Sequence, residues 1–561
     1  MSTDGSLAWL KSYPEGIKWD VEIDERPLFS LLDEAENHYP DKPALDFLGK
    51  KTSYRMLAAS VRRLAAGLQE LGVRPGVNVG IFMPNCPQFI ISYYAILKAG
   101  GTVVNYNPLY SVADLCHQID DSATEIMITL SLNVLYPKVA ACLGKTRLRK
   151  IIAGDFAEVL PLAKRLAFRL THRKDIAKIP QNGLYVSFAS LMKEGREVRP
   201  VTIHPDTHVA VLQYTGGTTG VPKGAVLTHA NLYANAVQCG MWFSGLRHGE
   251  EIILAALPLF HVFAMTAVMN LAIHTGSQII LHPKFDLKAI LYDIHFKHPT
   301  LMPGVPTMFA ALNNYPRIDK YDLSSLKMCF SGGAPLPQEV KEVFEKRAGC
   351  KLVEGYGLSE TSPVVAGNPL FGINKPGSIG IPFPATRIQI EDMHGSGKVM
   401  AVKEIGEICV SGPQVMQGYL HQFEENRGAL KDGFFHTGDL GYMDEDGYFF
   451  VVDRIKEMII SGGYKIYPRH LEEILYRHED VLEAAAIGVP HPERGQVVKL
   501  FIAPKEGRQI SEADMKSYLK DKVSGYSMPH HVEFRTSLPK SAIGKILKKI
   551  LVEEENRRTV K

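Results

Sequence analysis

Tyr214-Thr215-Gly216-Gly217-Thr218-Thr219-Gly220-Val221-Pro222-Lys223-Gly224 is the stretch that decides the fold. It follows an apolar run, 209–214, that predicts a buried strand bounded by turn residues. Its glycines let backbone N–H groups converge on an anion, its threonines add hydroxyl donors, and Lys223 adds a positive charge. A Thr or Asn cap and an apolar helical face follow over 225–232. The pattern therefore predicts a strand, a phosphate-binding loop and a helix.

This loop differs from a P-loop, which needs a Gly-Lys pair followed by Ser or Thr, whereas Lys223 precedes Gly224 and Ala225. The alternative is a flexible surface loop, but such a loop would rarely place so many donors and a lysine directly after a strand. The eleven residues resemble the signature motif of the adenylate-forming enzymes. This superfamily contains acyl-CoA synthetases, luciferases and peptide-synthetase adenylation domains.

Length and composition indicate a large globular enzyme. The 561 residues exceed a typical single domain several times, so we expect at least two domains. A net charge of +3 gives no argument for nucleic acid as a partner. The seven cysteines are scattered and lack any CxxC spacing, which argues against a disulfide framework or a structural zinc site. Neither a signal peptide nor a membrane-spanning run is visible, so a cytoplasmic enzyme is expected.

Strand and helix signals alternate from residue 27 onward, which predicts a parallel, doubly wound α/β sheet. From about 377 to 450, short strands and turns replace the helices and predict a small β-subdomain. The resemblance, which covers about residues 30–550, implies the rest of the architecture. It comprises a large N-terminal domain (1–452) of doubly wound sheets with a distorted β-barrel subdomain, a hinge (453–457), and a small mobile α+β C-terminal domain (458–561).

Residues 159–180 interrupt the alternation. Leucines at 162, 166 and 170 recur at helical spacing, and Arg165, Arg169, His172 and Arg173 fall largely on the opposite side. Such a basic amphipathic helix can lie on an anionic membrane surface, with residues 159–173 as the peripheral contact. A solvated helix packed on the main domain explains the pattern equally simply, and both interpretations stay open.

Two later motifs extend the nucleotide site. Tyr356 stands between Gly355 and Gly357, so its ring face is accessible for stacking on a purine, and Glu360 follows four residues later as a possible Mg²⁺ ligand. The resemblance implies that Asp439 holds the ribose and that Lys545, in a Pro-Lys-Ser-x-x-Gly-Lys loop, is catalytic. It gives as catalytic residues Thr215, His261, Glu360 and Lys545, and as ATP-binding residues Thr215, Gly216, Gly217, Thr218, Thr219, Gly220, Lys223, Gly333, Ala334, Pro335, Glu354, Gly355, Tyr356, Gly357, Ser359, Asp439 and Arg454.

Further positions follow from the same resemblance. Lys456 is the hinge residue. The acyl pocket contains His261, Val262, Met265, Gly304 and Val305, and the CoA path contains Gly463, Tyr464 and Lys465.

The chemistry of these groups points to a ligase. A carboxylate is already ionised at neutral pH and needs no general base, so catalysis must come from positioning and charge stabilisation. We expect a carboxylate and ATP to give an acyl-adenylate and pyrophosphate, after which CoA displaces AMP. The sequence resembles bacterial long-chain fatty-acyl-CoA synthetases, and the fatty acid, ATP with Mg²⁺, and CoA are the implied partners of a monomer or homodimer. The alternatives are a CoA ligase for aryl or medium-chain acids, an acyl-AMP ligase that loads a carrier protein, and an inactive lipid- or nucleotide-binding homologue.

Overall fold

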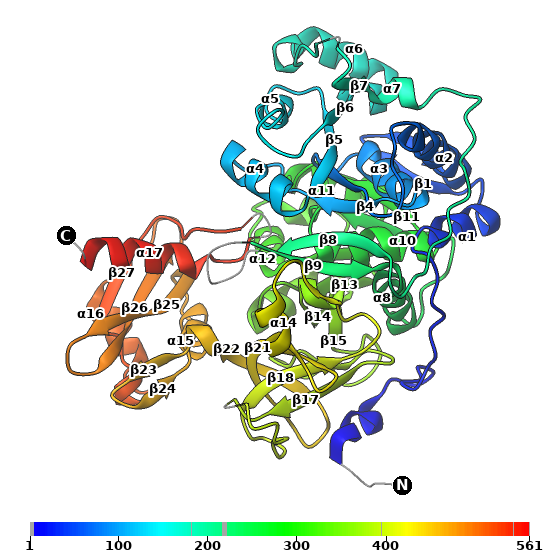
Figure 1. The fold of residues 1–561 in the computed structure, drawn as a ribbon. Coiled ribbons are helices and arrows are strands. Elements are labelled where there is room, and N and C mark those ends of the chain that lie inside the picture. Colours follow the sequence, from blue (N-terminus) through cyan, green and yellow to red (C-terminus); the bar gives the residue numbers. More distant parts are fainter. Residues whose placement is uncertain (1–4, 181, 216–221, 394, 542–543, 560–561) are drawn as a thin grey trace.

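The computed structural model describes the chain except for residues 1–4, 181, 216–221, 394, 542–543 and 560–561 (Figure 1). Its described residues form four sheets, of which three belong to a large N-terminal body and one to a C-terminal lobe. The expected fold class is confirmed: a large α/β body carries a smaller α+β lobe (Figure 1).

The first α/β sheet contains the signature strand at its centre. Its strand order is β19-β9-β8-β4-β3-β5-β6-β7, and the pairs from β8 to β7 are parallel. This part is the predicted doubly wound alternation, in which both faces are buried beneath helices. The strands are β3 (Asn78–Phe82), β4 (Thr102–Asn105), β5 (Thr124–Leu130), β6 (Lys150–Gly154), β7 (Tyr185–Ser187), β8 (Val209–Thr215), β9 (Lys223–Thr228) and β19 (Gly418–Tyr419).

The second α/β sheet has the order β16-β15-β14-β13-β12-β10-β11-β1-β2. Its middle is parallel, while β2, β15 and β16 pair antiparallel at the two edges. The strands are β1 (Pro43–Phe47), β2 (Lys50–Ser53), β10 (Ile252–Ala255), β11 (Gln278–Leu281), β12 (Leu301–Gly304), β13 (Met328–Ser331), β14 (Lys351–Gly357), β15 (Val364–Gly367) and β16 (Ile381–Pro382).

Helices cover these sheets with their apolar sides. In α2, for example, Leu57, Val61, Leu64 and Leu68 are buried at the spacing expected for one helix face. The helices of this body are α1 (Ser30–His38), α2 (Tyr54–Glu70), α3 (Pro87–Lys98), α4 (Val112–Asp121), α5 (Tyr136–Ala140), α6 (Leu162–Thr171), α7 (Phe188–Leu191), α8 (His229–Trp242), α9 (Val262–Ala264), α10 (Leu271–His274), α11 (Leu287–Lys297), α12 (Pro306–Asn313), α13 (Gln338–Ala348) and α14 (Phe423–Ala429).

The signature loop connects two strands, so the expected step from loop to helix is wrong. β8 pairs antiparallel with β9, with Thr215 opposite Lys223, which makes the signature a hairpin. Helix α8 begins only after β9, where Thr228 and Asn231 form a capping box. The run 225–227 pairs with β8 and buries Ala225 and Leu227, so no helix N-terminus follows the loop directly.

The β-subdomain is a sheet of five short strands: β17 (Arg387–Glu391), β18 (Gly406–Ser411), β20 (Leu430–Lys431), β21 (Phe434–Met443) and β22 (Phe449–Arg454). All its pairs are antiparallel. β22 ends at Arg454, so the chain leaves this sheet at the predicted hinge and enters the C-terminal lobe (Figure 1).

The C-terminal lobe has its own hydrophobic clusters, separate from the core of the main body. β25 and β26 form a long antiparallel pair that helices cover. The lobe contains β23 (Ile459–Ser461), β24 (Tyr464–Ile466), β25 (Val481–His491), β26 (Gly495–Pro504), β27 (His531–Phe534), α15 (Pro468–Tyr476), α16 (Glu512–Leu519) and α17 (Lys548–Thr559).

One cysteine pair contradicts the expectation from the sequence. Cys116 of α4 and Cys142, just after α5, form a disulfide with a Cα–Cα distance of 5.5 Å. The packing of α4 against α5 brings the two residues together, and their separation of 26 residues gave no spacing signal. Within the described residues, no helix is long and apolar enough to cross a membrane.

Candidate functional site

A cavity of about 1230 Å³ lies where the main body meets the C-terminal lobe. Its walls come from the ends of β8, β13 and β14, from the β-subdomain, from the hinge and from the loop that carries Lys545. Residues predicted to bind nucleotide therefore meet residues predicted to be catalytic, although they are up to about 330 positions apart in the sequence (Thr215 to Lys545). Residues 216–220, which were expected to bind phosphate, fall outside the described residues.

The described ends of the signature hairpin face this cavity. Thr215 and Lys223 both line it. Lys223 forms an ion pair with Glu425 of α14, and its ammonium lies 5.6 Å from the centre of the Tyr419 ring. The lysine is thus held by an ion pair and a cation–π contact at the phosphate end of the cavity, where a polyphosphate could compete with Glu425 for its charge.

Three predicted nucleoside contacts form one cluster. The Tyr356 hydroxyl donates a hydrogen bond to Asp439 over 2.6 Å, and Arg454 Nε lies 2.9 Å from the other carboxylate oxygen. Asp439 and Arg454 are register partners in the β21–β22 pair, which explains why the sequence separation of 15 residues brings them together. The side chain of Asp439 is only 4% exposed, so its charge depends on these two partners.

Glu354, which is buried, and Glu360, which is half-buried, are two carboxyl groups that line the cavity. Burial raises the pKa of Glu360, although the Tyr419 hydroxyl donates a hydrogen bond to it over 2.7 Å. Among the described residues it makes no ion pair, so a divalent cation would supply the missing positive charge. Burial also raises the pKa of Glu354 to about 7, and this carboxylate accepts a hydrogen bond from the backbone of Leu336.

Lys545 reaches into the cavity from the C-terminal lobe. Desolvation by the surrounding protein and the nearby Arg454 guanidinium lower its pKa, while Asp439 and Glu457 act in the opposite direction. Its neighbour Gly544 touches the main body closely: a Cβ at that position would lie 2.7 Å from the Thr307 hydroxyl. The C-terminal loop is therefore seated against α12 in this conformation.

His261 lies between the nucleotide end and the apolar end of the cavity. It caps α9, where its Nδ1 accepts a hydrogen bond from Phe263 N over 3.3 Å. Burial and the charge of Lys545 lower its pKa to about 4, so the imidazole is neutral at physiological pH. A neutral histidine beside a lysine can contact a carboxylate substrate without adding a second charge.

Beyond His261 the cavity becomes apolar. Val262 and the side chains of α8, α9 and β13 line this part, as do residues of the β15–β16 region. The sequence gave no signal for most of them, because isolated apolar residues on separate elements resemble any core: Cys239, Trp242, Phe243, Phe263, Ala267, Phe330, Val364 and Phe383.

Several predicted residues lie elsewhere. Of the expected acyl-pocket residues, Met265, Gly304 and Val305 do not line the described part of the cavity, and the same holds for Ala334 and Pro335. Asp439 does not line it either, but its carboxylate contacts Tyr356 and Arg454, which do. Met265 is fully buried and packs its sulfur 3.3 Å from the Asn105 amide, in a second layer behind the wall.

The predicted CoA residues stand apart from the cavity. Gly463 lies in the turn between β23 and β24 and is exposed, and Tyr464 stacks on the ring of Tyr526 in the C-terminal lobe. In this conformation the lobe thus presents Lys545 to the cavity and leaves Gly463 outside.

Sequence comparisons match the whole chain. The profile of the AMP-binding enzyme family matches residues 32–420, and the profile of the AMP-binding enzyme C-terminal domain matches residues 470–545. A long-chain-fatty-acid–CoA ligase of Bacillus subtilis is 44% identical, covering 98% of both chains. A feruloyl-CoA synthase of an Amycolatopsis species is 36% identical over 91% of this chain and 95% of its own length.

Solved structures agree with the fold. An anthranilate CoA ligase, AuaEII, in complex with anthranoyl-AMP is 25% identical and superposes with a TM-score of 0.84, covering 96% of this chain and 98% of that one. ATP-bound MatB from Rhodopseudomonas palustris is 27% identical with a TM-score of 0.81, covering 94% and 98% of the two chains.

Proposed function

The chain belongs to the AMP-binding enzyme family, and we propose that it activates a long-chain fatty acid with ATP and transfers the acyl group to CoA. The observation that carries the acyl specificity is the lining of the cavity. Besides the polar groups His261 and Lys545, the lining contains many aromatic and aliphatic side chains, which a hydrocarbon tail can contact. The Bacillus subtilis ligase, similar over its full length, supports the same chemistry.

In the first half-reaction the fatty carboxylate attacks the α-phosphorus of ATP and pyrophosphate leaves. The carboxylate needs no base, so the residues have to align two anions and stabilise the charge that builds up. We assign Tyr356 to the adenine, Asp439 and Arg454 to the ribose, and Thr215, Lys223 and Ser359 to the phosphates. Lys545 lies beside His261, where it would bridge the carboxylate and the α-phosphate.

Glu360 is the residue proposed to hold Mg²⁺. Its carboxylate lines the cavity and makes no ion pair with a described residue, which fits a cation that takes one protein carboxylate together with phosphate oxygens. When bound, Mg²⁺ would neutralise part of the charge of the triphosphate. Tyr419 then has two roles, because its hydroxyl orients Glu360 and its ring contacts the Lys223 ammonium.

The second half-reaction requires another arrangement of the lobe. CoA must reach the acyl-adenylate, yet Gly463 and its neighbours lie outside the cavity while Lys545 occupies it. We propose that the C-terminal lobe, residues 458–561, turns about the hinge 453–457, with Lys456 at its centre. The turn withdraws Lys545 and brings Gly463 to the site, so one adenylate serves two chemistries.

A substrate screen tests this function. Pyrophosphate release should be measured over acids of short, medium and long chain and over aryl acids, with and without CoA. We expect the highest kcat/KM for long-chain acids, with AMP and acyl-CoA formed in equal amounts when CoA is present. Preference for an aryl acid, or adenylate formation without transfer to CoA, would overturn the proposal in favour of the aryl ligase or the carrier-loading ligase.

We propose further that this enzyme acts in the cytoplasm, as a monomer or homodimer, and contacts anionic membranes through residues 159–173. Helix α6 supports the contact because its apolar side faces solvent and its basic side faces the protein. Leu162, Leu166 and Leu170 are 70%, 57% and 82% exposed, and no residue of the helix is buried. Arg165 and Arg169 turn toward the protein instead, where they bind the carbonyls of residues 157 and 158 and the carboxylate of Asp155.

Because helix α6 exposes its leucines, a membrane test should replace these residues. Replacing Leu162, Leu166 and Leu170 together with Gln should weaken binding to anionic vesicles about tenfold or more, because each leucine loses apolar area buried in the bilayer. Turnover of a soluble medium-chain acid should stay unchanged. Leu482→Gln, at an exposed site of the C-terminal lobe, is the matched control and should bind vesicles as the parent does. Undiminished vesicle binding by the triple variant would refute the contact.

A further inference from the structure

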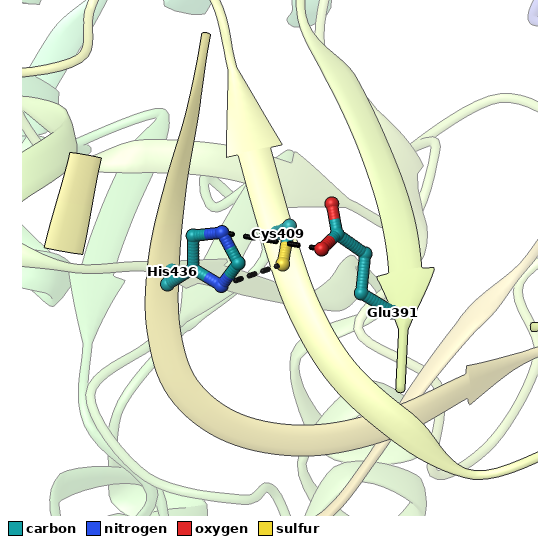
Figure 2. Close-up of side chains that lie close together, drawn as sticks. All are labelled: Glu391, Cys409 and His436. Atoms are coloured by element: carbon teal, nitrogen blue, oxygen red, sulfur yellow. Dashed lines mark hydrogen bonds and ion pairs between the residues drawn. The ribbon is translucent and has the colours of Figure 1, made fainter. Parts of the chain in front are cut away.

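Side chains of three different chemical types meet on the sheet of the β-subdomain (Figure 2). Glu391 ends β17, Cys409 lies in β18, and His436 lies in β21 directly opposite Cys409 in the strand register. The Cys409 sulfur lies 3.4 Å from His436 Nδ1, and Glu391 Oε2 lies 4.0 Å from His436 Nε2. One potential ligand atom from each residue lies within 4.8 Å of the other two.

A fourth residue fixes the imidazole. Glu407 Oε2 lies 3.1 Å from His436 Nδ1, so that nitrogen can donate to a carboxylate while Nε2 faces Glu391. Histidines that bind metals usually donate their second ring N–H to such a carboxylate, which sets the tautomer and the orientation of the ring. The other oxygen of Glu407 accepts a hydrogen bond from Gly438 N over 2.9 Å, next to Asp439.

The charges of this cluster call for a cation. Glu391 and Glu407 are direct partners across the antiparallel β17–β18 pair, an arrangement that is repulsive for like charges. Their side chains are only 8% and 15% exposed. Among the described residues no Lys or Arg forms an ion pair with either carboxylate, and His436 is the neighbour that both carboxylates share.

We propose that Cys409, His436 and Glu391 bind a divalent transition-metal ion of the Zn²⁺ type. A thiolate, an imidazole and a carboxylate are the ligands that Zn²⁺ takes in proteins, and the soft sulfur and nitrogen donors disfavour Mg²⁺. The three ligand atoms are close enough for small side-chain rotations to bring them around one ion, with water as a fourth ligand. His436 and Glu407 also line the main cavity, which gives the ion a route from solvent.

The sequence could not indicate this site by spacing. The three ligands come from separate strands at positions 391, 409 and 436, whereas the argument against zinc rested on the missing CxxC pattern. The ion would tie β17, β18 and β21 together next to the part of β21 that carries Asp439, through Glu407 and Gly438. The site thus differs from the Mg²⁺ site at Glu360 in its ligands and in its place.

Metal titration of the full chain tests the proposal. Tag-free protein is treated with a chelator, dialysed, and titrated with Zn²⁺ against a competing indicator and with Co²⁺ under absorption spectroscopy. We expect about one tightly bound Zn²⁺ per chain, as for other protein zinc sites with defined ligands. Bound Co²⁺ should show tetrahedral visible bands and a thiolate-to-cobalt charge-transfer band. The charge-transfer band identifies a cysteine ligand, so it separates this site from adventitious binding by surface histidines.

Variants assign the ligands. Cys409→Ser should remove the charge-transfer band, and Cys409→Ser, His436→Gln and Glu391→Gln should each weaken Zn²⁺ binding about 100-fold or more. Cys86→Ser, at another buried free cysteine where the N-cap position of α3 suits serine, should leave the band and the affinity unchanged. Melting curves with and without Zn²⁺ show that each variant is folded.

Either of two results would overturn the site. The first is a folded parent protein that binds no Zn²⁺ more tightly than about micromolar. The second is an unchanged charge-transfer band in Cys409→Ser, which places the thiolate ligand elsewhere.

Discussion

Replacing Lys545 by alanine is expected to slow adenylate formation about a hundred- to thousandfold, the usual loss when a charge-stabilising donor leaves an active site. The structure explains why the neighbouring His261 would not compensate. Lys545 is the part of the C-terminal loop that lies beside His261, and the loop is seated against Thr307 by the close approach of Gly544. His261 is neutral there, because burial and the charge of Lys545 lower its pKa to about 4. Burial, the larger of the two causes, remains in the variant, so His261 does not supply the positive charge.

The two half-reactions separate this role from a general loss of activity. Pyrophosphate release should fall in Lys545→Ala, whereas transfer of a supplied acyl-adenylate to CoA should stay within a few-fold of the parent. Lys516→Ala removes one positive charge from α16 on the same lobe and should leave both rates unchanged. Loss of both half-reactions in Lys545→Ala would contradict an adenylation-specific role.

The converse variant is Gly463→Leu, which should release pyrophosphate but form little thioester. If the lobe turns, Gly463 would line the path of the pantetheine arm, where a side chain would block the thiol. Its φ of +84° strains any replacement, so Gly462→Leu, with a φ of +56° in the same exposed turn, controls for strain alone. Equal defects of Gly462→Leu and Gly463→Leu in thioester formation would argue against the pantetheine path.

Local patterns of apolar residues were sufficient to predict many of the strands and helices. The alternation of strands and helices predicted from residue 27 onward is present, for example, in β3, α3 and β4. The apolar residues of these elements are the ones that are buried. The apolar pattern therefore predicts which side of each element faces the core. The hairpin was missed because the run 225–227 is short and apolar, and such a run does not distinguish a buried strand from the start of a helix.

Features that depend on contacts between elements far apart in the sequence could not be predicted from local patterns. The apolar wall of the cavity comes from α8, β13 and the β15–β16 region, and no residue in it differs locally from ordinary core. The disulfide and the cluster at His436 likewise depend on which elements become neighbours. Helix α6 shows a further limit, because periodicity defines two sides of a helix and packing decides which side faces the protein. Phe168, which packs its ring 5.5 Å from that of Phe156, anchors the helix and leaves its leucines exposed.

Replacing Asp439 by alanine should raise the KM for ATP about a hundredfold and abolish the discrimination against 2′-deoxy-ATP. The carboxylate is nearly fully buried and binds the Tyr356 hydroxyl and Arg454. In the proposed complex the ribose hydroxyls donate hydrogen bonds to this carboxylate. Hydrogen bonds to a charged group are worth about 1.5–3 kcal/mol each. Without the carboxylate, the 2′-hydroxyl has no hydrogen-bond acceptor, so the enzyme should no longer prefer ATP over 2′-deoxy-ATP.

The ratio of kcat/KM for ATP to that for 2′-deoxy-ATP measures this effect directly. It should fall to about 1 in Asp439→Ala, and part of it should return in Asp439→Asn, which keeps one acceptor oxygen. The ratio is independent of how much active protein is present, so partial unfolding of the alanine variant does not imitate the result. If Asp439→Ala still prefers ATP, then the ribose lies elsewhere in the cavity and Asp439 serves to hold Arg454 and Tyr356 in place.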